Sequence, residues 1–173
     1  MRIGQTTIPR MQVPALLKGQ MIFFNLANLR GQWGILSCLP SFEYGEAIFL
    51  NQCYRTVQKE NAMLLGMSLF ADPFLNTQQS KARILRMPVL ADPLQRLRRI
   101  FGVSENLSAN RSHSYFIDPG GLIRYHLTHS LNWRGLSFLI EILKHCQDEY
   151  SSSINVSKSE KSFHSLKYIV SQP

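Results

Sequence analysis

Cysteine is scarce in this chain. The 173 residues include three cysteines, Cys38, Cys53 and Cys146, which are too few and too scattered for a disulfide-stabilised scaffold. No two of them form a Cys-x-x-C pair, so this redox-active dithiol motif is absent. The odd number is compatible with reduced thiols, and we expect a cytoplasmic location.

Long hydrophobic runs are also missing. The longest, residues 21–29, is interrupted by Asn25 and Asn28 and is far shorter than the roughly 20 apolar residues of a membrane helix. No apolar segment follows the first residues, so we expect no secretory signal. The sequence contains neither a glycine-rich phosphate loop nor a nucleophile elbow, and no cofactor is expected.

Acidic residues are outnumbered by basic ones. There are 11 Asp and Glu against 19 Lys and Arg, which gives a formal net charge of +8 and favours acidic partners in a non-specific way. The basic residues gather partly between Lys81 and Arg99, without an aromatic platform beside them. We interpret this cluster as a solvated helix face and do not expect nucleic-acid binding. A basic binder of nucleic acid or anionic surfaces stays a third hypothesis, which steep salt dependence of binding would support.

The middle of the chain alternates between buried strands and helices. Residues 33–39 and 62–70 are nearly continuous apolar runs, which are typical of buried strands. Between them, apolar residues recur every three or four positions, which predicts an amphipathic helix over 46–60 with Cys53 on its apolar face. The first 31 residues contain short apolar runs broken by proline and glycine and predict small strands and turns.

The second half of the chain predicts three helices and a hairpin. We expect a helix over 73–84, a short strand over 88–90, a basic helix from Asp92-Pro93 to Phe101 closed by Gly102, hairpin strands over 115–117 and 122–125, and a last helix over 133–148. This order indicates an α/β fold. We expect one domain over residues 1–148 and a polar C-terminal tail over residues 149–173.

Several segments, taken in order, resemble the peroxiredoxin family. They are residues 29–36 (Leu-Arg-Gly-Gln-Trp-Gly-Ile-Leu), 46–68 with its Gly-Met-Ser end, 87–93 (Met-Pro-Val-Leu-Ala-Asp-Pro), 115–124 (Tyr-Phe-Ile-Asp-Pro-Gly-Gly-Leu-Ile-Arg), and the segment that starts at 133 with Trp-Arg. The resemblance covers about residues 8 to 148. It implies a thioredoxin-like fold of peroxiredoxin type, with a central mixed sheet flanked by helices.

The resemblance also implies where a catalytic site would be. A peroxiredoxin carries its thiolate in the first turn of a helix, within the pattern Pro-x-x-x-Thr-x-x-Cys, where backbone N–H groups and an Arg lower the pKa of the thiol. The matching segment here is 40–47, Pro-Ser-Phe-Glu-Tyr-Gly-Glu-Ala. Counting forward from Pro40 puts Tyr44 in the Thr position and Ala47 in the cysteine position.

A second register comes from counting back from Gly66. It puts Glu43 in the cysteine position, Pro40 in the Thr position and Glu46 on a Glu that follows the family cysteine, and it makes the loop about four residues short. Neither register supplies a cysteine. A carboxylate or a methyl group cannot attack a peroxide as a thiolate does. We interpret Glu43 and Glu46 as loop surface and helix N-terminal charge.

The supporting residues and the remaining thiols leave alternatives open. The family Arg falls on Ser112, with Arg111 one position away. Cys38 lies near the end of the central strand, close to the expected pocket, while Cys53 and Cys146 are at apolar helix positions. We interpret all three cysteines as core residues, because a reactive thiol needs an exposed, electropositive environment.

Two histidines are candidate metal ligands. His126 and His129 are three residues apart, and in a strand this spacing puts them on opposite faces, which suits one metal poorly. We interpret them as solvated surface residues and expect no metal site.

The missing nucleophile favours a peroxiredoxin-like protein without peroxidase activity. Such a protein would act through its surface as a binding or structural subunit, with protein partners in a larger complex or as a homodimer. The alternative is an enzyme, a divergent thiol peroxidase or oxidoreductase that uses Cys38 or Cys53. That alternative predicts a thiol with a low pKa that alkylating reagents modify readily.

Overall fold

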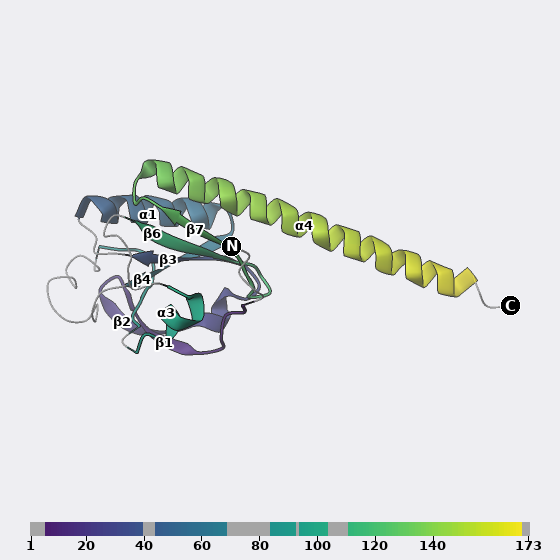
Figure 1. The fold of residues 1–173 in the computed structure, drawn as a ribbon, viewed down its shortest axis with the longest axis horizontal. Helices are drawn as coiled ribbons and strands as arrows, with labels where there is room; N and C mark the ends of the chain where they lie inside the picture. Colours follow the sequence, from purple (N-terminus) through teal and green to yellow (C-terminus); the bar gives the residue numbers. More distant parts are fainter. Residues whose placement is uncertain (1–5, 40–43, 69–83, 93, 104–110, 171–173) are drawn as a thin grey trace. The chain divides into compact units, whose positions relative to one another are not determined.

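A seven-stranded mixed sheet forms the centre of the protein in a computed structural model (Figure 1). The structure describes residues 6–39, 44–68, 84–92, 94–103 and 111–170. The strands lie in the order β2-β1-β5-β4-β3-β6-β7. Their bounds are β1 Gln12–Leu17, β2 Gln20–Asn25, β3 Trp33–Leu39, β4 Ala62–Ser68, β5 Val89–Leu90, β6 Ser112–Ile117 and β7 Ile123–His129.

The central strands are β3 and β4, which run parallel. All seven residues of β3 are buried, as a near-continuous apolar run requires when both faces of a sheet are covered. β5 continues the parallel arrangement beside β4. The buried strands predicted at these positions are confirmed, although residues 69–70 lie outside the described part of the chain.

The N-terminal part forms a hairpin, as its short apolar runs predicted. β1 and β2 pair antiparallel around Lys18 and Gly19, which have φ values of 51° and 79°. Two successive residues with positive φ are the usual connection in a tight hairpin. β1 joins the sheet by pairing antiparallel with β5, and a short 3-10 helix, Leu26–Leu29, leads from β2 towards β3.

The second hairpin, β6 and β7, flanks β3 on its other side. Its predicted turn is confirmed: the Asp118 carboxylate accepts hydrogen bonds from the Leu122 N–H at 2.9 Å and from Arg124 Nε at 2.7 Å. Both strands extend further than the sequence indicated, to Ser112 and His129. This extra length places six more polar residues in the sheet, which are Ser112, His113, Ser114, His126, Thr128 and His129.

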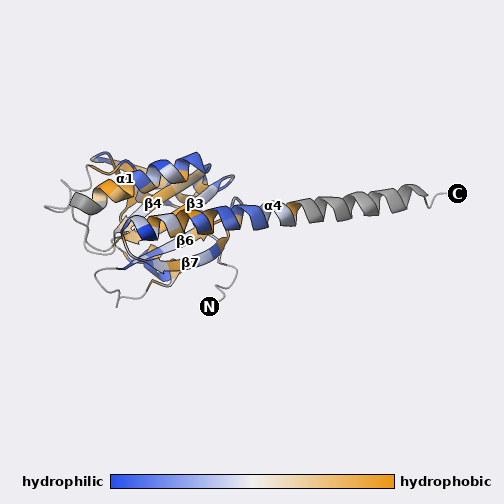
Figure 2. Ribbon diagram, turned by 90° about the horizontal axis from the view of Figure 1, so that it is seen from above, coloured by the Kyte–Doolittle hydropathy of each residue, from blue (hydrophilic) through white to orange (hydrophobic). Residues whose placement is uncertain are grey.

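Helices cover both faces of this sheet. α1 (Tyr44–Lys59) lies on one face, and its apolar stripe of Ala47, Leu50, Cys53 and Val57 is buried. Figure 2 shows hydrophobic colouring along β3 and β4, between the helices. The predicted helix over 46–60 is therefore confirmed.

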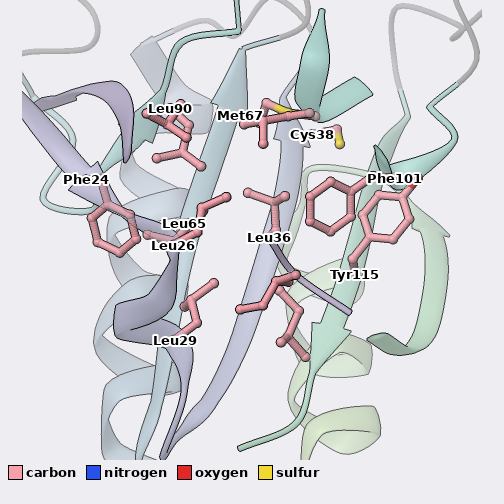
Figure 3. Close-up of a cluster of buried hydrophobic side chains, with 14 of the residues drawn as sticks. Phe24, Leu26, Leu29, Leu36, Cys38, Leu65, Met67, Leu90, Phe101 and Tyr115 are labelled. Atoms are coloured by element: carbon pink, nitrogen blue, oxygen red, sulfur yellow. The ribbon is translucent and has the colours of Figure 1, made fainter. Parts of the chain in front are cut away.

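α3 (Arg96–Phe101) belongs to the opposite face. Its buried side chains, Leu97 and Phe101, belong to a core cluster with residues of β1, β3, β4 and β6. Figure 3 shows part of this cluster, including Leu36, Met67 and Tyr115. The cluster is the main apolar contact between the sheet and this side of the molecule.

The predicted start of this helix is wrong by three residues. Instead of beginning after Asp92, the chain makes a turn in which the Asp92 carbonyl accepts a hydrogen bond from the Gln95 N–H at 2.9 Å. Gln95 then adopts a φ of 53°, and the helix begins at Arg96. The Asp92 carboxylate still accepts a hydrogen bond from the Arg98 N–H at 2.8 Å. The predicted end at Gly102, with a φ of 63°, is confirmed.

The last helix, α4 (Trp133–Val170), begins where the sequence predicted and continues well beyond residue 148. Residues 149–170 are therefore helical in backbone rather than irregular. The chain divides into two compact units, residues 1–140 and 141–173, and the expected boundary at 148 stays a prediction. The predicted helix over 73–84 lies almost entirely outside the described residues. No helix in the described part of the chain has the length and hydropathy of a membrane span.

Candidate functional site

The first turn of α1 is where the resemblance placed a catalytic thiolate. Ala47 lies there with its side chain fully buried, and Tyr44 is the first residue of the helix. Pro40 and Glu43, which the second register would use, lie outside the described residues. A buried methyl group at Ala47 supplies neither a nucleophile nor a hydrogen-bond donor.

The position of the family Arg is occupied by Ser112 at the start of β6. Its side chain is fully buried, and its hydroxyl donates a hydrogen bond to the Cys38 carbonyl oxygen at 2.9 Å. Arg111, one residue earlier, is exposed. Ser112 therefore links β6 to β3. Its neutral hydroxyl cannot stabilise a thiolate as the positive charge of an Arg would.

Cys38 lies near the end of β3 and is fully buried. Figure 3 shows its sulfur beside Met67, Phe101 and Tyr115, within the apolar cluster. Burial raises the pKa of the Cys38 thiol far above its usual range, and the nearby positive charge of Arg98 opposes this only in part. The thiol is therefore protonated at neutral pH.

The other two thiols are also buried. Cys53 lies on the inner face of α1, and burial raises the pKa of its thiol to about 12. Cys146 is 2% exposed. The prediction that all three cysteines are core residues is confirmed by their burial, and neither Cys38 nor Cys53 has the low pKa that the enzyme alternative requires.

A hydrogen-bonded chain that the sequence did not indicate lies on the α1 side of the sheet. Ser37 Oγ and Ser114 Oγ are 2.7 Å apart, and Ser114 Oγ is 2.8 Å from His129 Nε2. His129 Nδ1 is 3.1 Å from the Ser130 carbonyl oxygen. Because a carbonyl oxygen only accepts, Nδ1 donates to it and Nε2 accepts from Ser114. Ser37 then donates to Ser114, so all three hydrogen bonds of this series point in the same direction.

The interpretation of His129 as a solvated histidine is wrong. It is 9% exposed, and burial lowers its pKa. As the last residue of a strand that runs further than predicted, His129 faces the covered side of the sheet, where Ser114 and Ser37 supply its partners. Strand pairing, which places Ser37 opposite Ser114, would have been needed to find this group.

Ser37 and His129 also line a small cavity, together with Cys53, Leu64 and Leu136. Its volume is about 20 Å³, which is enough for one water molecule. Apolar side chains make up almost all of its wall. This cavity is too small for an organic substrate, so the buried chain of hydroxyl groups and imidazole serves the core.

A pair of histidines lies on the opposite face of the second hairpin. His113 Nδ1 is 2.7 Å from His126 Nε2, and the Tyr115 ring stacks on His126 with 4.6 Å between ring centroids. His126 and His129 do face opposite sides, as predicted, because His126 pairs with Tyr115 and His129 with Ser112 in the register. The hairpin register also puts His113 on the same face as His126, and no local sequence pattern indicates this pairing.

In the described part of the chain, no group of three or more His, Cys, Asp or Glu residues is placed so that it could hold a metal ion. A catalytic metal centre with three protein ligands, of the usual zinc type, is therefore not formed by these residues.

Comparison with known proteins decides the family. The sequence model of the AhpC/TSA family matches residues 5–126, which is well over half of the chain. The chain belongs to the AhpC/TSA family. No curated protein matches the sequence significantly.

Solved structures agree with this assignment. The AhpC of Enterococcus faecalis superimposes with a TM-score of 0.70 at 19% identity, covering 87% of this chain and 96% of that one. The mitochondrial 2-Cys peroxiredoxin of Plasmodium falciparum gives 0.67 at 16% identity, with 87% and 98% covered. The reduced 2-Cys peroxiredoxin of Plasmodium vivax gives 0.66 at 17%, with 84% and 96% covered. The predicted peroxiredoxin-type thioredoxin-like fold is confirmed.

Proposed function

We propose that this AhpC/TSA-family protein lacks thiol-peroxidase activity and acts through its surface as a binding or structural subunit. The observation that carries the proposal is the state of its thiols: each is buried, and burial raises the pKa of both Cys38 and Cys53. Ala47, one of the two candidates for the catalytic position, is a buried methyl group.

The chemistry of peroxide reduction explains why these thiols matter. A thiolate attacks one peroxide oxygen, the O–O bond breaks, the sulfur becomes a sulfenic acid and the other oxygen leaves as an alcohol or water. Only the thiolate attacks at a useful rate. With a pKa of about 12, on the order of one Cys53 thiol in 10⁵ is ionised near neutral pH.

The direct test is peroxide consumption by the purified full chain with dithiothreitol as the electron donor. We expect a rate equal to that of the donor alone, and equal to that of a variant with all three cysteines replaced by serine. A protein-dependent rate that disappears in Cys38→Ser or Cys53→Ser and persists in Cys146→Ser would overturn the proposal.

The alternative, a divergent thiol enzyme, is favoured by one observation near Cys38. Arg98 Nε is buried and has no hydrogen-bond partner among the described residues, and the charge of Arg98 lowers the pKa of the Cys38 thiol. Desolvation is nevertheless the larger effect on this pKa. Alkylation of the native protein distinguishes the two functions, because the enzyme requires fast modification of Cys38 at neutral pH.

The surface role is supported by exposed apolar side chains on β2, an edge strand of the sheet. Met21 is 62% exposed and Phe23 70%, and exposed apolar groups on an edge favour contact with another protein. We infer one or more protein partners, in a larger complex or a homodimer, and a cytoplasmic location. Gentle isolation from native cells is expected to recover the chain with a stoichiometric partner, and recovery as a monomer alone would contradict this role.

A further inference from the structure

His113 and His126 present two imidazole nitrogens to one point on the surface of the β6–β7 hairpin. His113 Nδ1 and His126 Nε2 are 2.7 Å apart, and the ring planes differ by 19° with centroids 4.9 Å apart. Rings that are nearly parallel at this separation, with two nitrogens this close, lie almost edge to edge. The two nitrogens therefore face each other and share a hydrogen bond, in which one donates and the other accepts.

The hairpin register fixes this pair. His113 is opposite Thr128, and His126 is opposite Tyr115, so all four side chains belong to the same face of the sheet. Tyr115 is 2% exposed and stacks on the His126 ring, which holds the orientation of that imidazole. Thr128 Oγ1 lies 3.5 Å from His113 Nδ1 and adds an oxygen at the same point.

Both imidazoles are suited to accept a cation. Partial burial lowers the pKa of His113 and of His126. The charges of His126 and His129 lower the pKa of His113 further. Metal coordination requires neutral imidazole with a free lone pair. His126 is exposed and His113 half-buried, so the nitrogens are accessible from solvent while their positions are fixed by the sheet.

We propose that His113 and His126 form a two-histidine site for a divalent transition metal ion, with Cu²⁺ bound more tightly than Ni²⁺ or Zn²⁺. Imidazole suits these three metals, and the usual order of affinity places Cu²⁺ first. Each imidazole keeps its single proton on the nitrogen that faces away from the metal. Water molecules fill the other coordination positions, with the Thr128 hydroxyl beside them.

The required movement is small. With metal–nitrogen bonds of about 2.0–2.1 Å, two ligands at roughly 90–110° have nitrogens about 2.9–3.4 Å apart. The observed 2.7 Å must therefore increase by a few tenths of an ångström, and the metal ion would replace the hydrogen bond between the two rings. A small turn of the His126 ring within its own plane, which keeps the ring stacked on Tyr115, would supply this distance and direct both lone pairs to one ion. Cys38 is opposite His113 in the register but is buried in the core cluster, so the site has two protein nitrogens and no thiolate.

The test is a titration of the purified, chelator-treated full chain with Cu²⁺ by isothermal titration calorimetry near pH 7.5, together with electron paramagnetic resonance of the 1:1 complex. We expect one ion bound per chain, nitrogen hyperfine structure from two imidazoles, and a loss of affinity of about tenfold or more in His113→Gln and in His126→Gln. The matched control is His145→Gln, since His145 is an exposed histidine elsewhere whose Nε2 is 3.3 Å from the Glu149 carboxylate.

Two results would overturn the inference. One is that His113→Gln and His126→Gln bind Cu²⁺ as tightly as the unchanged chain or His145→Gln does. The other is a Cu²⁺ spectrum of the unchanged chain with fewer than two nitrogen ligands, which needs no variant and so does not depend on folding of the substituted proteins. Neither measurement involves peroxide, so the result is independent of the proposed function.

Discussion

Cys38 and Ser112 are both fully buried, and a side-chain-to-backbone hydrogen bond connects them. The Ser112 hydroxyl, at the position of the family Arg, binds the Cys38 carbonyl oxygen, and the Cys38 thiol is inside the apolar cluster. A thiol among Met67, Phe101 and Tyr115 is a small apolar side chain in its physical behaviour. The sequence has no cysteine at either candidate catalytic position, and the structure adds that the three cysteines it does have are buried.

The raised pKa of Cys53 predicts a loss of stability in alkali. The ordinary value is 9.0 and the folded value about 12, so above pH 9 the unfolded chain loses this proton while the folded chain keeps it. The free energy of unfolding should then fall by about 1.4 kcal/mol per pH unit from this group, until the pH reaches its folded pKa. Denaturant unfolding from pH 8 to 11 should show a shallower decline in Cys53→Ala.

Leu50→Ala is the control for that measurement. Leu50 is buried on the same face of α1 and does not ionise, so its replacement should lower stability equally at every pH. An unchanged pH slope in Cys53→Ala would contradict the prediction.

Ser114 is expected to be the critical member of the buried hydroxyl chain. Ser114→Ala removes the group between Ser37 Oγ and His129 Nε2 and leaves both without that partner, which costs about 1–3 kcal/mol. Chemical denaturation measures the difference. Ser137→Ala is the control, because that exposed hydroxyl donates only to the Trp133 carbonyl of its own helix. An effect of Ser114→Ala no larger than that of the control would rule out this role.

At the scale of elements, the start of α4 depends on close backbone approach. Asn132 Oδ1 accepts a hydrogen bond from the Gly135 N–H at 3.0 Å, and this turn brings Gly135 against the Ser130 carbonyl. The same carbonyl is the acceptor for His129 Nδ1. A glycine in the first turn of a helix therefore has a packing reason here, since a Cβ at this position would collide with that oxygen.

Gly135→Ala should destabilise the protein even though alanine favours helix formation by about 1 kcal/mol relative to glycine. The added methyl group would contact the Ser130 carbonyl oxygen and lie 3.1 Å from His129 Nδ1. Displacing this backbone costs roughly 1–3 kcal/mol, so the net change in the free energy of unfolding is expected to be a loss. A gain in stability on denaturation would show that the loop moves freely. Ser137→Ala, in the same helix, supplies the comparison.

The whole molecule combines an intact family fold with a long terminal helix. It superimposes on structures of an AhpC and of two 2-Cys peroxiredoxins with TM-scores of 0.66 to 0.70, over at least 84% of the chain. None of the described side chains from 149 to 154 is buried. The apolar core residues that the structure describes all precede this segment.

A chain that ends at residue 148 should retain the stability of the full chain. The described apolar core residues all lie before that position, so the denaturation midpoint is expected to stay the same while the helical circular dichroism signal decreases. A lower midpoint would show that residues 149–173 contribute to the folded state. This measurement also tests the domain boundary expected from composition.

Much of the fold followed from local patterns. The apolar runs of β3 and β4, the period of α1 and the turn after Asp118 each depend on neighbouring residues, and all were predicted correctly. The start of α3 was wrong because a turn at Gln95 replaced the expected cap at Asp92. Propensity identifies a capping residue but does not exclude a competing turn.

The sequence by itself determined the family fold and the absence of cysteine at both candidate catalytic positions, because hydrophobic period and residue identity are local properties. Tertiary structure decided the rest. Ser37, Ser114 and His129 meet only because β3, β6 and β7 are neighbours, and His113 meets His126 only through hairpin register. The pKa of Cys38 is raised by burial among side chains such as Met67, Phe101 and Tyr115, which come from β4, α3 and β6. These contacts depend on strand pairing between distant parts of the chain, so no local pattern predicts them.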